Sequence, residues 1–151
     1  MRAVVQRVTS ASVTSRSGPT EPFTVVGTIG AGLLVLVGVT HDDAQASADK
    51  LASKLAGLRV FDDAGGAMNL GARDVGASFL VVSQFTLYGD TSKGRRPSWV
   101  AAARPDQAEP LVERVVERLR DDGFSVETGR FRTEMQVSLV NDGPITLVVE
   151  T

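Results

Sequence analysis

The feature that most constrains this chain is a set of short apolar stretches built from residue types that favour β-strands. The two strongest are GLLVLVGV at residues 32–39 and FLVVSQFTL at residues 79–87. Runs of this length, bounded by glycine and polar residues, are typical of strands buried on both faces. We therefore expect both strands to need cover on each side, from helices, a second sheet or a partner subunit.

Further strands are predicted where apolar residues alternate with polar ones. They fall at residues 3–8, 58–61, 124–128, 131–140 and 145–150, and in the first part of residues 24–39, which read as two strands with Gly27, Gly30 and Gly32 between them. The polar stretch TSRSGPTEP, at residues 14–22, contains glycine and two prolines, which predicts a hairpin tip. The stretch DDAGGAMN, at residues 62–69, predicts a turn-rich connection.

Two segments have helical periodicity instead. Asp42 or Asp43 can cap the first, whose apolar positions are Ala48, Leu51, Leu55 and Leu58. The second starts near Pro105 and Asp106 and stops at Gly123. Its apolar side holds Leu111, Val112, Val115, Val116 and Leu119. Two helices among many strands, without βαβ alternation, predict an α+β fold with a mainly antiparallel, barrel-like sheet. Residues 1–151 are expected to form a single domain.

Composition excludes several kinds of chemistry. The chain has no cysteine, so it has no disulfide, no cysteine nucleophile and no cysteine-ligated zinc. Its only histidine, His41, stands beside two aspartates at a helix start, which does not suggest a Ser-His-Asp triad. The one tight acidic cluster, DDAGGA, lacks the register of a calcium loop, so we expect no metal.

The cellular setting follows from the same composition. The first residues lack the uninterrupted apolar core of a signal peptide, and no run is long enough to span a bilayer, so we expect a cytoplasmic protein. A formal net charge of −2 gives no electrostatic footprint for wrapping duplex nucleic acid. The short basic run KGRRPS, at residues 93–98, is either a solvated loop or a local contact with a nucleic acid.

Polar residues at the end of the strand 79–87 are the first candidate for a functional site. In a regular strand Ser83 and Thr86 face opposite sides, so both can reach one site only if the strand is distorted. Backbone groups have no such restriction, and the N–H of Phe85 could bind a developing oxyanion. The alternative is a capped strand end, in which the polar groups are simply paired.

The second candidate is the stretch SLVNDGPITLVVE at residues 138–150. Its pattern predicts a strand, a break at Asn-Asp-Gly-Pro and another strand. The break is either a hairpin loop or a backbone feature held in place to contact a ligand.

Taken together and in order, six motifs span essentially the whole chain: MRAVVQRV, LLVLVGVT, LRVF, SQFTLYGDTSKGRRPS, VETG and VNDGPITL. This set resembles the D-aminoacyl-tRNA deacylases. The resemblance implies a homodimer with active sites at the subunit interface, acting on the acceptor end of aminoacyl-tRNA and using neither DNA, a membrane, a metal nor another cofactor. It implies hydrolysis of the ester of D-aminoacyl-tRNA, and of mischarged glycyl-tRNA.

The same resemblance assigns residues to roles. Ser83, Gln84, Phe85 and Thr86 are expected to line the catalytic pocket, with the Phe85 N–H binding the carbonyl or oxyanion and Ser83 and Gln84 positioning substrate. Gly143 and Pro144 are expected to form a cis peptide bond that enters the partner's active site and excludes L configuration. Arg7 is expected to support that filter, and Phe131 and Met135 to contact the terminal adenosine.

Thr86 would be the covalent nucleophile if there were one. No residue in the chain is an obvious base to activate its hydroxyl, so water attack assisted by the ribose 2′-hydroxyl of the substrate is the expected route. Two other hypotheses stay open: a non-catalytic module that binds nucleic-acid ends, and an esterase that uses Thr86 or Ser83. This chain departs from the family at Arg132 and Thr133, where the family usually has Gly-Ala, and this could alter the pocket.

Overall fold

The computed structural model describes all residues, 1–151. One mixed sheet dominates it, with strand order β2-β1-β3-β6-β7 and with β8 paired to β1. Its strands are β1 (Arg2–Arg16), β2 (Thr24–Ile29), β3 (Gly32–Gly38), β6 (Ser78–Ser83), β7 (Val126–Thr128) and β8 (Glu134–Glu150). A small hairpin sheet consists of β4 (Arg59–Asp62) and β5 (Met68–Gly71). The helices are α1 (Gln45–Gly57), α2 (Pro105–Asp121) and the 3₁₀ helix η1 (Phe85–Tyr88).

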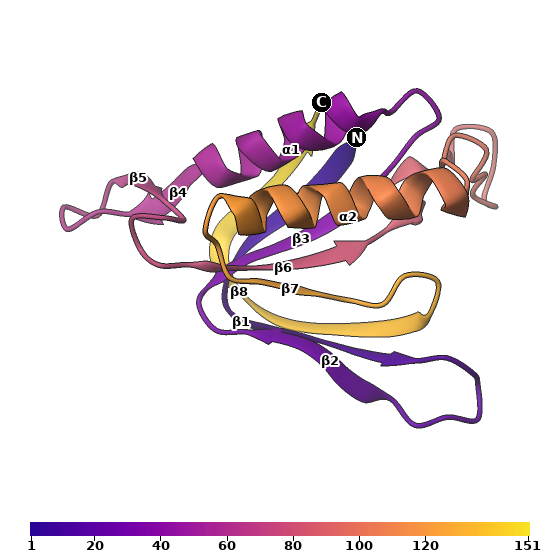
Figure 1. Ribbon diagram of the computed structural model, residues 1–151, viewed down its shortest axis with the longest axis horizontal. Coiled ribbons are helices and arrows are strands. Elements are labelled where there is room, and N and C mark those ends of the chain that lie inside the picture. The colour runs from indigo at the N-terminus through magenta and orange to yellow at the C-terminus, as the bar shows by residue number, and fades with distance from the viewer.

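The helices and the sheet form a layered arrangement (Figure 1). Helices α1 and α2 lie side by side over one face of the sheet, and the sheet curls below them. The pairs of β1 with β2, β3 and β8 are antiparallel, while β3–β6 and β6–β7 are parallel. The predicted α+β fold, with two helices and a mainly antiparallel, barrel-like sheet, is confirmed. Neither helix is both long and apolar enough to cross a membrane.

The central strands are buried on both faces, as their continuous apolar runs predict. Along β6, Phe79 and Val81 join the core beneath the helices, while Leu80 and Val82 join a second apolar cluster on the opposite face. In β3, Leu33 and Val35 point to the first core, and Leu34 points to the second. Full burial of each such side chain stabilises the fold by about 1.5–3 kcal/mol. The two-sided cover comes from the helices on one face and from the curled sheet on the other.

Several predicted element ends are wrong. The strand predicted at residues 3–8 extends to Arg16, and the one predicted from residue 131 begins at Glu134. The N-cap of α1 is Ala44, not an aspartate. Asp43 instead accepts a hydrogen bond from the Thr40 N–H at 2.8 Å and pairs with the Met1 ammonium at 2.5 Å. The strand predicted to run to Leu87 stops at Ser83, because the chain turns into η1 there.

The hairpin interpretation of the Asn-Asp-Gly-Pro segment is also wrong. Strand β8 stays on the same partner on both sides of it, since Asn141 pairs with Val8 and Thr146 pairs with Gln6. Residues 142–145 therefore bulge out opposite a single β1 residue, Arg7. The Asn141 amide closes the base of this bulge, donating to the carbonyls of Arg7 at 2.8 Å and Ile145 at 3.0 Å. We call residues 142–145 the β8 bulge.

Candidate active site

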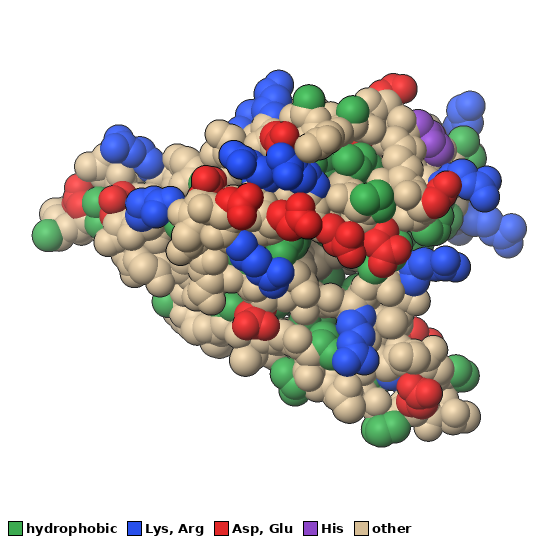
Figure 2. Space-filling model, in the orientation of Figure 1, with side chains coloured by type: hydrophobic (Ala, Val, Ile, Leu, Met, Phe, Trp, Pro, Cys, Tyr) green, Lys and Arg blue, Asp and Glu red, His purple; other side chains and the backbone are tan.

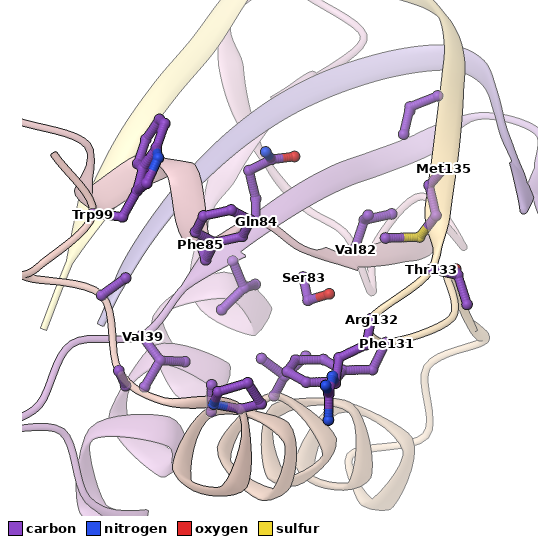
Figure 3. Close-up of a pocket in the computed structure, with 17 residues that line it drawn as sticks. Val39, Val82, Ser83, Gln84, Phe85, Trp99, Phe131, Arg132, Thr133 and Met135 are labelled. Atoms are coloured by element: carbon purple, nitrogen blue, oxygen red, sulfur yellow. The ribbon is translucent and has the colours of Figure 1, made fainter. Parts of the chain in front are cut away.

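A cavity of about 620 Å³ opens beside the end of β6 (Figure 3). Its walls come from β3, β6, η1, the loop before α2, the N-terminal part of α2, and β8 with the segment that leads into it. It brings together five of the predicted site residues: Ser83, Gln84, Phe85, Phe131 and Met135. Most of the lining is apolar, 12 residues of 17, so the few polar groups decide what the cavity can orient.

The polar end of β6 is positioned by its ladder with β3. Ser83 is the last paired residue, opposite Val37, and the Gln84 N–H then donates to the Val37 carbonyl at 2.7 Å. The chain turns into η1 directly over Gly38. A Cβ at Gly38 would lie 3.1 Å from the Gln84 carbonyl and 3.1 Å from the Leu87 Cβ. The close approach of η1 to β3 therefore favours glycine at this position, because a Cβ would force its neighbours to move by a few tenths of an ångström.

Phe85 begins η1 and presents both its ring and its backbone. The ring is 56% exposed and packs edge-to-face on Trp99, with ring centroids 5.5 Å apart. The Phe85 N–H lies in the first turn of η1, where helix geometry provides no acceptor within the helix. The Phe85 N–H is also not the donor in any backbone hydrogen bond of the turns, loops and helix caps. An N–H of this kind beside a largely apolar cavity is suited to receive a carbonyl or oxyanion.

Thr86 lies outside the cavity lining. Its hydroxyl accepts a hydrogen bond from the Gln84 side-chain amide. His41 is exposed, with Nε2 2.7 Å from the Val100 carbonyl oxygen, and it is not among the lining residues. Burial, and to a smaller degree the charge of Asp43, raise the pKa of the Tyr88 phenol, which disfavours its ionised form. The one side chain that pairs with the Thr86 hydroxyl is therefore the Gln84 amide, which cannot act as a base.

Phe131 and Met135 also line the cavity, and Met135 lies beside Val82 of β6 (Figure 3). Met135 belongs to β8, where it pairs with Ser15 of β1, and Phe131 stands in the segment just before β8. Gly129 lets the Met135 side chain approach, because a Cβ there would lie 2.6 Å from the Met135 sulfur. The result is an aromatic face and a flexible thioether at one side of the cavity, which suits a flat ring.

Arg132 and Thr133, the two departures from the family pattern, also line the cavity. Arg132 adopts a left-handed backbone conformation, with φ of 59°. This region favours glycine and is uncommon for residues with a longer side chain. Glycine would fit this backbone without strain, and arginine occupies it at a conformational cost.

Arg7, Gly143 and Pro144 do not line this cavity. The Gly143–Pro144 peptide bond is cis, and both residues are exposed on the β8 bulge. The Arg7 side chain is buried, with Nε 2.9 Å from Asp142 Oδ2 and Nη1 2.6 Å from the Val60 carbonyl oxygen. Exposed apolar side chains flank the bulge along β8: Leu139, Val140, Leu147 and Val148.

Charge around the site is unevenly distributed. A second groove of about 460 Å³ adjoins the cavity and shares Ser83, Val112 and Phe131 with it, and its lining includes Glu109, Glu113, Glu117 and Arg120 of α2. Figure 2 shows carboxylates in a row across the face that carries this helix. The chain contains no group of three or more His, Cys, Asp or Glu side chains that could hold a metal ion.

Sequence reasoning missed part of the lining. Trp99, Ala102, Ala103 and Pro105 close one side of the cavity. They belong to the loop after η1 and to the start of α2, about 20 residues from Ser83. The only signal in the sequence was Trp99, the single tryptophan, immediately after the basic run. Lys93, Arg95 and Arg96 of that run are exposed and form no ion pair.

Comparison with known proteins gives a consistent picture. The chain is 56% identical over 151 residues to a protein named D-aminoacyl-tRNA deacylase from Symbiobacterium thermophilum, covering 100% of this chain and 96% of that protein. It is also 56% identical over 151 residues to one of the same name from Bacillus licheniformis, covering 100% and 99%.

Solved structures agree with this fold. One named c-Myc DNA Unwinding Element Binding Protein superposes with a TM-score of 0.90 at 36% identity, over 100% of this chain and 99% of the other. A probable eukaryotic D-amino acid tRNA deacylase superposes with a TM-score of 0.79 at 15% identity, over 99% and 98%, and shows the fold alone. The model of the D-Tyr-tRNA(Tyr) deacylase family matches residues 4–150. The resemblance seen in the motifs is confirmed, and the chain belongs to the D-Tyr-tRNA(Tyr) deacylase family.

Proposed function

We propose that this protein hydrolyses the ester of D-aminoacyl-tRNA, releasing the free D-amino acid and tRNA. One observation carries the proposal. In a member of this family, the cavity is lined by Phe85, whose N–H donates none of the turn, loop and cap hydrogen bonds, and by the flat, apolar side chains of Phe131 and Met135. Such a cavity can hold a terminal adenosine and the ester next to it. Relatives that match over their full length carry the name of this activity.

In the proposed reaction the terminal base packs against Phe131 and Met135, and Ser83 and Gln84 orient the aminoacyl group. The ester carbonyl oxygen points at the Phe85 N–H. A water molecule attacks the carbonyl carbon, and the N–H stabilises the negative charge that develops on oxygen. The ester bond to the ribose breaks, and the proton lost by the water ends on the departing ribose oxygen by way of the neighbouring 2′-hydroxyl. The protein contributes orientation and charge stabilisation, and no side-chain base is required.

Chiral selection is proposed to come from the β8 bulge of a second copy of the chain. Three observations support this. Gly143 and Pro144 are exposed and do not line the cavity of their own chain. The bulge is fixed at its base by the Arg7 guanidinium and the Asn141 amide. The exposed apolar residues beside it on β8, including Val140 and Val148, suit burial against another subunit.

A main-chain wall of this kind reads configuration without reading side-chain identity. It would exclude a side chain on the L face of the α-carbon and admit D-amino acids of varied size. Glycine has no side chain to exclude, so the proposal includes glycyl-tRNA as a substrate. Because main chain has no rotamers, the wall cannot move aside for an L substrate without moving the whole bulge.

The decisive assay compares D-Tyr-tRNA, L-Tyr-tRNA and Gly-tRNA with purified protein, with and without a metal chelator. We expect rapid hydrolysis of the D and glycyl esters, slow hydrolysis of the L ester and no effect of chelation. Equal rates of hydrolysis of the D and L esters would contradict the proposed chiral filter. If none of the three esters is hydrolysed faster than in buffer alone, the proposed activity is rejected. Loss of activity on chelation would show that a metal is needed.

A second candidate is a module that binds nucleic-acid ends without turnover. It is favoured by the name of the solved structure at 36% identity, which refers to DNA binding, and by the exposed cations Lys93, Arg95 and Arg96. It predicts retention of single-stranded DNA or RNA while the lifetime of the aminoacyl ester stays that of free solution. Accelerated ester hydrolysis together with no retention of single-stranded DNA would reject it.

A further inference from the structure

The cavity contains a single ionisable side chain, Arg132. The other lining residues are apolar or carry only hydroxyl or amide groups. The Arg132 side chain forms no hydrogen bond or ion pair with the rest of the chain. Most other arginines do form such contacts, for example Arg7, Arg16 and Arg114. Figure 3 shows its guanidinium extending beside Phe131. The only formal charge lining the cavity is therefore positive and has no counter-ion.

The segment that carries Arg132 is held in place. The Thr133 hydroxyl donates to the Arg130 carbonyl at 2.9 Å, and it lies 2.6 Å from the Ser15 hydroxyl of β1. These contacts fix the turn on which Arg132 sits, with its φ of 59°. A left-handed arginine is unfavourable by itself, so the local backbone is imposed by its surroundings. The direction in which the side chain leaves the turn is consequently set by the fold.

Neighbouring carboxylates do not neutralise this charge. Glu109 and Glu113 line the adjoining groove and not the cavity, and neither lies within 4.0 Å of the Arg132 guanidinium nitrogens. A guanidinium presents planar, paired N–H donors that match the oxygens of a phosphate. An anion beside the base that packs on Phe131 would satisfy these donors.

We propose that Arg132 makes part of this cavity a phosphate subsite, so that it binds a nucleoside 5′-monophosphate in preference to the nucleoside. This assignment rests on the proposed function: the bound phosphate is the one that joins the terminal adenosine to the rest of the tRNA. The subsite depends on the arginine at position 132. It adds affinity for the nucleotide end and contributes no group to the reaction itself.

The test is calorimetric titration of the whole protein with adenosine and with AMP at low salt. Three proteins are compared: the wild type, Arg132→Gln and the matched control Arg130→Gln. Arg130 is exposed, as Arg132 is, and lies two residues away, but it does not line the cavity. Both replacements make the same change of net charge. We expect AMP to bind the wild type about tenfold more tightly than adenosine, because a charge-assisted pair with phosphate is a strong contact. The preference should fall to about twofold or less in Arg132→Gln and persist in Arg130→Gln.

Equal wild-type affinities, or no measurable binding of AMP, would overturn the proposal. So would an AMP preference that survives Arg132→Gln, or one that Arg130→Gln removes equally. Hydrolysis of D-Tyr-tRNA by the same preparations separates this inference from the proposed function. Wild-type hydrolysis without an AMP preference rejects the phosphate subsite alone, and absence of hydrolysis rejects the activity alone. If both hold, Arg132→Gln should raise KM for the tRNA severalfold and change kcat less.

Discussion

The Arg7 Nε lies 2.9 Å from Asp142 Oδ2 and 3.3 Å from the Asp142 carbonyl oxygen, so one buried guanidinium holds both the side chain and the main chain of the β8 bulge. The same guanidinium donates to the Val60 carbonyl at 2.6 Å and approaches the Asp62 carboxylate at 3.5 Å. It therefore ties the bulge to β4 as well as to its own strand. The segment that carries Gly143 and Pro144 is exposed at its tip and anchored at its base.

Replacing Arg7 should loosen this anchor. We expect Arg7→Ala to lower the free energy of unfolding by about 2 kcal/mol, because the buried Val60 carbonyl loses a charged donor and Asp142 loses its partner. The control is Arg16→Ala, which breaks a more exposed pair with Glu134 and should cost less than about 1 kcal/mol. Urea denaturation measures both. If the bulge is the chiral filter, the ratio of D-Tyr-tRNA to L-Tyr-tRNA hydrolysis should also fall in Arg7→Ala and stay unchanged in Arg16→Ala.

Thr86→Val removes the hydroxyl and keeps the shape of the side chain. Because that hydroxyl pairs with the Gln84 amide and does not line the cavity, we expect kcat to fall by about tenfold or less, through looser placement of Gln84. Loss of a covalent nucleophile would cost several orders of magnitude. Single-turnover kinetics and mass spectrometry of the quenched enzyme distinguish the two cases. A trapped acyl group on Thr86 would contradict the proposed water attack.

Gly38→Ala tests the placement of η1. The new Cβ would lie 3.1 Å from the Gln84 carbonyl and from the Leu87 Cβ, so η1 must shift away from β3. We expect a loss of about 1–3 kcal/mol in the free energy of unfolding and a fall in kcat, since the shift carries the Phe85 N–H with it. Gly30→Ala is the control, because no atom lies within 4 Å of its added Cβ. Unchanged stability in Gly38→Ala would show that the strand end has room to relax.

The left-handed turn at residue 132 gives a stability test that is separate from binding. Arg132→Gly and Arg132→Ala both remove the guanidinium, but only glycine adopts a φ of 59° without steric cost. We expect the glycine variant to be more stable than the alanine variant by about 1 kcal/mol in urea denaturation. Equal stabilities would mean that the turn changes conformation when the arginine is removed.

Acid should weaken the contact between the two helices. The Asp49 carboxylate of α1 accepts a hydrogen bond from the Arg114 Nε of α2 at 2.7 Å. This bond, with the charges of Arg114 and Arg118, lowers the pKa of Asp49 below its ordinary value, against a smaller opposing effect of burial. A lowered pKa in the folded state stabilises the protein above the unfolded pKa, and this contribution is lost as the pH falls through the folded value.

The Asp49→Asn variant should therefore be less stable than the wild type at neutral pH, and the difference should shrink below about pH 4. Thermal unfolding followed from neutral pH down to about pH 2 measures it. A difference that stays constant over this range would show that the ion pair contributes nothing to the acid dependence.

The order of side chains along the chain was enough to predict the elements that a core requires. The apolar runs of β3 and β6 predicted strands covered on both faces, and the spacing of Leu51 and Leu55 predicted a helix, because burial follows directly from local periodicity. The motif set was enough to identify the family. The ends of the elements were harder to predict. Asp43, which was expected to cap α1, instead binds the Thr40 N–H and the Met1 ammonium.

The tertiary structure alone decided which of the predicted site residues line the cavity and which lie elsewhere. Only strand pairing shows that residues 142–145 bulge opposite Arg7. Arg7 and Asp142 are 135 positions apart in sequence, and a local pattern cannot encode the register between such distant segments. Only the turn into η1 shows that Thr86 faces Gln84 and not the cavity. Likewise, Arg132 becomes the single charge lining an apolar cavity because the lining comes from four separate parts of the chain, which meet only when α2 packs on the sheet.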